Sequence, residues 1–259
     1  MAAVRFVAIG DSFTEGVGDE LPDGRVRGWA DLVAEGWAAA SDERVEYANL
    51  AIRGKLIAPI VAEQLEPALA LKPTHLSFNG GGNDMLRPRT SISHVTDLFM
   101  HVVERCEEEG VQLIALSGAN PSGQLPLRPV IQKRGDLLSE AVAARLRDYP
   151  EVVTAWNWPD RELATPPYWS EDRLHMNARG HHRVAARVLT ALGVPVPTGW
   201  WSLPELTDIR SLRGFGYYAE HVGPWIRRRL TGTSSGDGRE PKYGAWTLMV
   251  PADQADDTR

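Results

Sequence analysis

Five short apolar runs, separated by patterns typical of amphipathic helices, are the feature that most restricts how this chain can fold. The runs have the length and the β-branched or aromatic content of buried strands, and they occupy residues 4–9, 45–50, 74–78, 111–118 and 151–158. Helical patterns follow them at residues 27–40, 55–71, 91–110, 130–150 and 177–193. Strands that alternate with helices in this way form a parallel sheet that is covered on both faces.

This alternation predicts an α/β fold, a three-layer α/β/α sandwich with a five-stranded parallel sheet. We expect the flavodoxin-like strand order 2-1-3-4-5. Pro59 and Pro67 are expected to interrupt the helical pattern at residues 55–71, because proline lacks the N–H that a helix interior uses. The alternation stops near residue 193, which predicts a main domain of residues 1–193.

Residues 194–259 are predicted to be a C-terminal extension of the main domain. The segment is rich in proline and tryptophan and too short for a core of its own. We expect a helix within residues 209–230 and flexible last residues after Pro251. The side chains expected to pack on the main domain are Trp200, Trp201, Trp225 and Trp246.

Composition excludes several classes of protein. The 259 residues are 43% hydrophobic and 24% charged, a composition typical of an ordinary globular protein. The net charge of −6 predicts no nucleic-acid partner. The single cysteine, Cys106, cannot form an internal disulfide and fits a reducing compartment. No apolar run reaches the roughly 20 residues that span a bilayer, and no signal-peptide pattern is present. These features predict a cytoplasmic protein.

Polar residues follow several of the predicted strands at the point where each strand ends. The carboxyl ends of parallel strands meet at one edge of a sheet, which is where ligands bind in such folds. We therefore expect one shared cleft for Asp11 and Ser12 after the first strand, Gly54 after the second, Asn83 and Asp84 after the third, and Asp172 and His175 after the fifth.

These residue types are the ones that acyl transfer requires. Serine is a weak nucleophile until a base takes its proton, and His175 is of the right type to do so. Asp172, three residues before His175, can orient the imidazole and stabilise its charged form. The backbone N–H groups of Ser12 and Gly54, with the Asn83 amide, are candidate donors to an oxyanion. Asp11 and Asp84 flank these groups and are predicted to support them.

Four sequence blocks together resemble those of the SGNH (GDSL-type) hydrolases. The blocks are "GDSFTEG", "NLAIRG", "GGND" and "DRLH", in this order, and the resemblance covers about residues 4–192. It implies the three-layer fold and identifies Ser12, Gly54, Asn83 and His175 as the four name-giving residues, with Asp172 completing a triad. It also implies a hydrolase of the esterase, lipase, thioesterase or carbohydrate-deacetylase type.

Other interpretations of the same residues remain open. Ser12 is also a suitable helix N-cap. Asp11, Asn83, Asp84 and several histidines would also suit a metallophosphoesterase, and a binding module without activity could have the same fold. The sequence predicts no cofactor and no metal site, and it favours a packing or surface role for His181 and His182 over a role as ligands. A second serine, Ser234, lies in a G-x-S-x-G pattern but follows no predicted strand, so we reject it as a nucleophile.

The substrate is expected to be a small-molecule, lipid or sugar ester. Four aromatic residues are candidates for contact with it, because they can line an acyl pocket or stack on a sugar ring: Trp156, Trp158, Tyr168 and Trp169. The sequence leaves open the physiological substrate, its acyl-chain length, the choice between ester, thioester and sugar acetate, the oligomeric state and the role of the extension.

Overall fold

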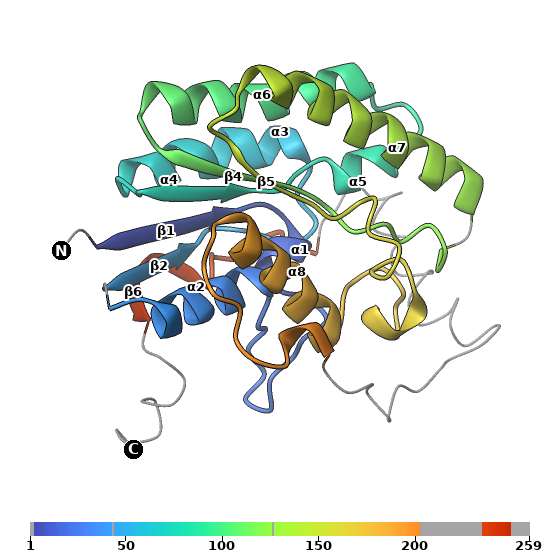
Figure 1. Cartoon of the computed structure of the whole chain (residues 1–259). Coiled ribbons are helices and arrows are strands. Elements are labelled where there is room, and N and C mark those ends of the chain that lie inside the picture. Colours follow the sequence, from blue (N-terminus) through green and yellow to red (C-terminus); the bar gives the residue numbers. More distant parts are fainter. Residues whose placement is uncertain (1–2, 43, 126, 203–234, 250–259) are drawn as a thin grey trace.

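One six-stranded sheet forms the centre of the protein, whose computed structural model describes residues 3–42, 44–125, 127–202 and 235–249 (Figure 1). The strand order is β5-β4-β3-β1-β2-β6. The first five strands are mutually parallel, so the predicted order 2-1-3-4-5 is confirmed. The strands are β1 Val4–Ile9, β2 Val45–Asn49, β3 His75–Phe78, β4 Gln112–Ser117, β5 Val153–Trp156 and β6 Tyr243–Met249.

The sixth strand is a departure from the predicted five-stranded sheet. β6 comes from the C-terminal extension and pairs antiparallel with β2, with Val45 opposite Met249 and Tyr47 opposite Thr247. An edge strand presents a row of unpaired backbone groups, and β6 supplies partners for those of β2. The sequence pattern missed this strand because β6 lies outside the alternation of strands and helices that defined the other five.

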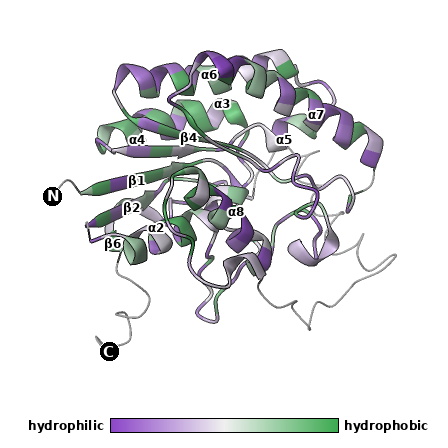
Figure 2. Ribbon diagram, in the orientation of Figure 1, coloured by the Kyte–Doolittle hydropathy of each residue, from purple (hydrophilic) through white to green (hydrophobic). Residues whose placement is uncertain are grey.

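Helices cover both faces of the sheet (Figure 1). α2 (Trp29–Ala40) and α8 (Ala178–Ala191) lie on one face, and α6 (Ile92–Glu108) and α7 (Arg128–Arg145) lie on the other. β1 serves both layers because its side chains alternate: Phe6 packs in the core under α2, whereas Val7 packs in the core under α6. Figure 2 shows the hydrophobic residues concentrated in the strands, as the three-layer prediction requires.

The helical segment between β2 and β3 continues through both of its prolines. It consists of α3 (Ile57–Ile60), a π-helical turn (Val61–Leu65) and α4 (Glu66–Ala70). Leu65 and Glu66 keep right-handed helical backbone angles. Pro67, which cannot donate a backbone hydrogen bond, lies two residues after the end of the π-helical turn, so the predicted interruption is a local π-helix rather than a break.

Parts of the predicted extension lie outside the described residues, namely the expected helix at 209–230, Trp225, Ser234 and the segment after Pro251. Of the described tryptophans, Trp200 packs edge-on against His182 with 5.2 Å between ring centroids, and Trp246 stacks under the guanidinium of Arg5 at 4.7 Å. Trp201 is 43% exposed. The division at residue 193 stays a prediction.

Cys106 lies buried on the inner face of α6 as a free thiol. Burial raises the pKa of this thiol to about 12. A thiol that stays protonated is a poor nucleophile and a poor metal ligand. Cys106 therefore serves as a small apolar core residue.

Candidate active site

Ser12 begins a short helix, α1 (Ser12–Glu15), and two residues separate this helix from the end of β1. Asp11 caps this helix, because its Oδ1 accepts a hydrogen bond from the backbone N–H of Phe13 at 3.1 Å. The N-cap role that the sequence allowed for Ser12 thus belongs to its neighbour. The Ser12 side chain instead faces a cavity at the carboxyl edge of the sheet, together with His175.

Ser12, His175 and Asp172 form a continuous line of hydrogen-bonding groups. Nε2 of His175 lies 3.1 Å from Oγ of Ser12, and Nδ1 of the same ring lies 2.5 Å from Oδ2 of Asp172. The other carboxylate oxygen of Asp172 accepts from the backbone N–H groups of Leu174 and His175, both at 2.9 Å, and from the Ser170 hydroxyl at 2.7 Å. These bonds hold the carboxylate in one orientation.

The environment of Asp172 keeps its carboxylate ionised. Burial pushes its pKa upward, but the hydrogen bond and charge of His175 and the two backbone N–H groups together bring the pKa below its usual value. An ionised carboxylate on Nδ1 places the ring proton there and leaves Nε2 free to accept a proton from Ser12. This is the arrangement that a serine nucleophile with a histidine base requires.

Asn83 lies in α5 (Gly82–Met85) and lines the same cavity as Ser12. Its amide nitrogen donates to Oδ2 of Asp11 at 3.1 Å and to the backbone oxygen of Lys55 at 3.0 Å. The amide is therefore held between the segment that carries Ser12 and the loop after β2. Burial raises the pKa of Asp11 to about 6, with the charge of Asp84 adding to the rise, while the Phe13 N–H and His175 oppose it.

Gly54 occupies the loop between β2 and α3, where its φ of 76° is one that residues with a side chain rarely adopt. It is not among the residues that line the cavity. Its neighbour Arg53 connects the loop to α1, because the backbone N–H and the Nε of Arg53 donate to the Glu15 carboxylate at 2.6 and 2.8 Å. The loop that carries Gly54 is thus tied to the helix that carries Ser12.

Two further side chains brace this edge of the sheet. Asp84 accepts from the backbone N–H of Ile57 at 2.9 Å, which joins α5 to the start of α3, and burial raises the pKa of Asp84. Gln64 makes two hydrogen bonds with the backbone of Gly10: it accepts at 2.8 Å and donates at 3.0 Å. Sequence reasoning missed Gln64, since nothing local indicates that a residue 54 positions away contacts Gly10.

Three of the four predicted aromatic contacts line the cavity: Trp156, Trp158 and Trp169. Tyr168 is not among the lining residues, so its contact with a substrate stays a prediction. Its ring packs under the guanidinium of Arg179 at 4.8 Å, and its hydroxyl donates to the Glu162 carboxylate. Tyr168 ends the short 3₁₀ turn of Pro166–Tyr168, and Trp169 follows that turn. The two adjacent side chains point in different directions, and of the two only Trp169 lines the cavity.

His181 and His182 are buried in α8 and are not among the residues that line the cavity. Nδ1 of His181 accepts from the backbone N–H of Trp29 at 3.2 Å, and burial lowers the pKa of His181 to about 3. The ring is therefore neutral and joins α8 to the start of α2. Among residues 3–42, 44–125, 127–202 and 235–249, no three histidine, cysteine or acidic side chains cluster as metal ligands do.

The sequence matches the GDSL-like Lipase/Acylhydrolase family over residues 8–183. The chain belongs to this family. The resemblance to the SGNH hydrolases is thereby confirmed, and the protein is a carboxylic ester hydrolase. The matched region contains the serine, glycine, asparagine and histidine blocks and ends within α8, so the C-terminal extension lies beyond it. No helix in the described part of this hydrolase is long and apolar enough to cross a membrane.

Solved structures share the fold of this hydrolase. Axe2, an acetylxylan esterase from Geobacillus stearothermophilus, superposes with a TM-score of 0.60 at 19% identity, covering 76% of this chain and 98% of its own. LAE5, an α/β hydrolase enzyme from the metagenome of Lake Arreo, Spain, superposes with a TM-score of 0.60 at 23% identity, covering 74% of this chain and 97% of its own. No curated protein matches the sequence. The three-layer fold is thus confirmed, and the substrate is not indicated by these similarities.

Proposed function

We propose that this enzyme hydrolyses carboxylic esters through an acyl-enzyme formed on Ser12. The observation that carries the proposal is the hydrogen-bonded line from Ser12 through His175 to Asp172. Oγ of Ser12 lies 3.1 Å from Nε2 of His175, and Nδ1 of His175 lies 2.5 Å from Oδ2 of Asp172. In the first step Oγ of Ser12 attacks the ester carbonyl carbon while Nε2 of His175 takes its proton. The imidazolium then returns the proton to the leaving alkoxide, and the alcohol departs.

In the second step water hydrolyses the acyl-enzyme. His175 removes a proton from water, the resulting hydroxide attacks the acyl carbonyl carbon, and the proton passes back to Oγ as the carboxylic acid leaves. Both steps pass through a tetrahedral oxyanion. The backbone N–H of Ser12, the N–H of Gly54 and the Asn83 amide are the proposed donors to it. Because the Asn83 amide already donates to Asp11 and Lys55, the oxyanion takes over or shares one of those bonds.

The same groups would also serve a thioesterase or a carbohydrate O-deacetylase, since both reactions attack an acyl carbonyl. Acetylxylan esterases share the fold, but the identity of 19% supports the fold alone. A metal-dependent phosphoesterase is the competing class, suggested by Asp11, Asn83 and Asp84. It predicts that a chelator abolishes activity, whereas the serine mechanism predicts activity unchanged by the chelator.

The test is p-nitrophenyl butyrate hydrolysis by the wild type and by Ser12→Ala, with Ser234→Ala as the matched control. We expect Ser12→Ala to lose activity and Ser234→Ala to retain it. A fluorophosphonate should label the wild type, and mass spectrometry of the digest should place the label on the Ser12 peptide. Full activity in Ser12→Ala, or labelling elsewhere, would refute the assignment.

A further inference from the structure

The cavity beside Ser12 extends sideways along the carboxyl edge of the sheet. It has an internal volume of about 120 Å³ and begins at Ser12 and His175. From there it is lined by Asn79 after β3, Ser117 at the end of β4 and Trp156 at the end of β5. Because β1, β3, β4 and β5 are successive neighbours in the sheet, the cavity runs away from the nucleophile in one direction.

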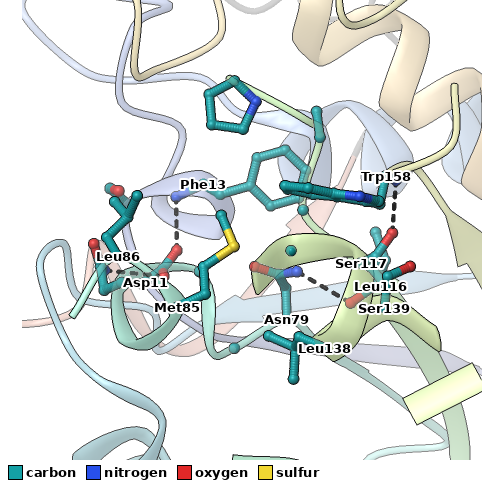
Figure 3. A pocket seen from close by; sticks show the side chains of 18 of the residues that line it. Asp11, Phe13, Asn79, Met85, Leu86, Leu116, Ser117, Leu138, Ser139 and Trp158 are labelled. Atoms are coloured by element: carbon teal, nitrogen blue, oxygen red, sulfur yellow. Dashed lines mark hydrogen bonds between the residues drawn. The ribbon is translucent and has the colours of Figure 1, made fainter. Parts of the chain in front are cut away.

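One face of α7 forms a wall of this cavity. The lining residues on α7 have the spacing i, i+3, i+4 and i+7 that places side chains on one side of a helix; they are Gly135, Leu138, Ser139 and Val142. Val142 and Phe99 of α6, which also lines the cavity, are each 2% exposed. The cavity therefore reaches into the apolar layer between the sheet and the outer helices. Figure 3 shows Phe13, Asn79, Leu138 and Trp158 around it.

Three polar side chains along this cavity already make a hydrogen bond within the protein. The Asn79 amide donates to the Leu116 carbonyl at 3.0 Å. The Ser117 hydroxyl oxygen accepts from the Trp158 backbone N–H, and the Ser139 hydroxyl oxygen accepts from the Trp156 indole, both at 2.8 Å. Among the described lining residues, Asp11 and His175 alone carry ionisable side chains. Most of the lining residues are apolar, so burying sugar hydroxyl groups here would cost more than burying a hydrocarbon chain.

Trp158 and Gly135 limit the size of the cavity. A Cβ added at Gly135 would lie 1.9–2.0 Å from two atoms of the Trp158 ring, so the indole packs directly on the helix backbone. The indole N–H donates to Asp136 at 2.8 Å, which holds the ring in that position. Packing and this hydrogen bond therefore hold the Trp158 wall in place. A wall held in place limits how far a bound chain can extend toward it.

We infer that this cavity is an acyl-chain pocket and that the enzyme prefers esters of acyl groups with about four to six carbons. An apolar cavity of roughly 150 Å³ binds benzene, a molecule of six carbons, and the present cavity is slightly smaller. The inference rests on the proposed function, because it places the acyl carbonyl at Ser12 and the acyl chain along β3, β4 and β5. The alcohol part of the ester then lies outside the pocket, toward solvent.

The first experiment measures kcat/KM for p-nitrophenyl esters from acetyl to dodecanoyl. Burying one CH₂ group corresponds to about 0.8 kcal/mol, or about fourfold in kcat/KM. We expect a rise of about this size per CH₂ from acetyl to between butyryl and hexanoyl, followed by a decline for longer chains. A preference for the acetyl ester, or no dependence on chain length, would overturn the pocket while leaving the serine mechanism intact.

The second experiment changes the pocket itself. Leu138→Trp fills it, and Leu137→Trp is the matched control, because Leu137 is the adjacent residue on α7, is 47% exposed and does not line the cavity. We expect the ratio of hexanoyl to acetyl kcat/KM to fall at least tenfold in Leu138→Trp and to stay at the wild-type value in Leu137→Trp. Equal ratios in the two variants would overturn the proposal.

A third measurement separates the pocket from catalysis. Ser12→Ala protein is titrated with sodium hexanoate and with sodium acetate, and binding is followed by the fluorescence of the tryptophans in the pocket. Hexanoate is expected to bind at least tenfold more tightly than acetate. Equal affinity for the two would refute the pocket without using activity. Absence of ester hydrolysis and of fluorophosphonate labelling in the wild type would instead refute the proposed function.

Discussion

The ammonium group of Lys242 donates a hydrogen bond of 2.5 Å to the backbone oxygen of Glu15, the last residue of the helix that begins with Ser12. The same group contacts Oδ2 of Asp31 at 2.5 Å. Lys242 directly precedes β6, so the C-terminal extension reaches the helix that begins with Ser12. Because the Glu15 side chain also holds Arg53, this contact links the extension to the loop that carries Gly54.

Replacing Lys242 with Met should destabilise the fold and weaken catalysis. The variant leaves the Asp31 carboxylate, which is 6% exposed, without its cation. Breaking a buried ion pair from one side costs about 3–5 kcal/mol, and urea denaturation measures this loss. Adding Asp31→Asn to Lys242→Met should recover part of the stability, since no buried charge remains. A Lys242→Met protein as stable as the wild type would show that the contact does not contribute.

The Asp172→Asn variant should fold normally and lose most of its activity. An amide cannot stabilise the imidazolium and can favour the wrong tautomer of His175, a change that lowers kcat by about 10⁴ in enzymes with such triads. The matched control is Glu171→Gln, which neutralises the adjacent carboxylate. We expect kcat near the wild-type value in the control. If the two variants behaved in the opposite way, Glu171 would be the residue that orients His175.

The pKa of Asp172 also determines how activity depends on pH. Because this pKa lies below its usual value, the carboxylate stays ionised as the pH falls from 8 to 5. Its stabilising interactions are therefore retained over that range and lost only in stronger acid. A loss of kcat/KM between pH 8 and 5 would accordingly not come from Asp172. Asp11, with a pKa of about 6, titrates within this range, and the kcat/KM profile of Asp11→Asn measures its share of the loss.

Asn83→Ala should lower kcat more than it changes KM. Removing one donor to an oxyanion costs about 10²–10³ in kcat, while the ground-state ester makes weaker use of the same donor. Steady-state kinetics with p-nitrophenyl butyrate separates the two parameters. Weak binding with normal turnover would show that Asn83 contacts the substrate without stabilising the transition state.

Asp11→Asn should change how stability depends on pH. The folded-state pKa of Asp11 is about 6, above its value near 3.9 in an unfolded chain. The folded state therefore binds the proton more tightly, and stability rises as the pH falls through 6. Between pH 7.5 and 4.5 the wild type should gain about 2 kcal/mol relative to Asp11→Asn, whose uncharged side chain does not titrate. Urea denaturation at both pH values gives this difference, and parallel pH curves would contradict it.

Much of the fold and of the site is determined by local sequence. The alternating patterns specify five strands in parallel order, because a strand and the helix after it must bury their apolar faces together. Asp172 and His175 are three residues apart and meet within one turn of chain, so their contact follows from short-range geometry. Ser12, Asn83 and His175 were predicted to share one edge for a similar reason: parallel strands end on the same side.

Only the tertiary structure decided the contacts that join distant segments. Lys242 meets Glu15 across 227 positions, and Gln64 meets Gly10 across 54. No local pattern marks either pair, since a lysine or glutamine suits many exposed sites equally well. The same holds for Tyr168 and Trp169, adjacent aromatic residues of which one turns toward arginines and the other toward the cavity. Local sequence sets backbone conformation over a few residues, whereas which long-range partners meet depends on how the whole set of layers packs.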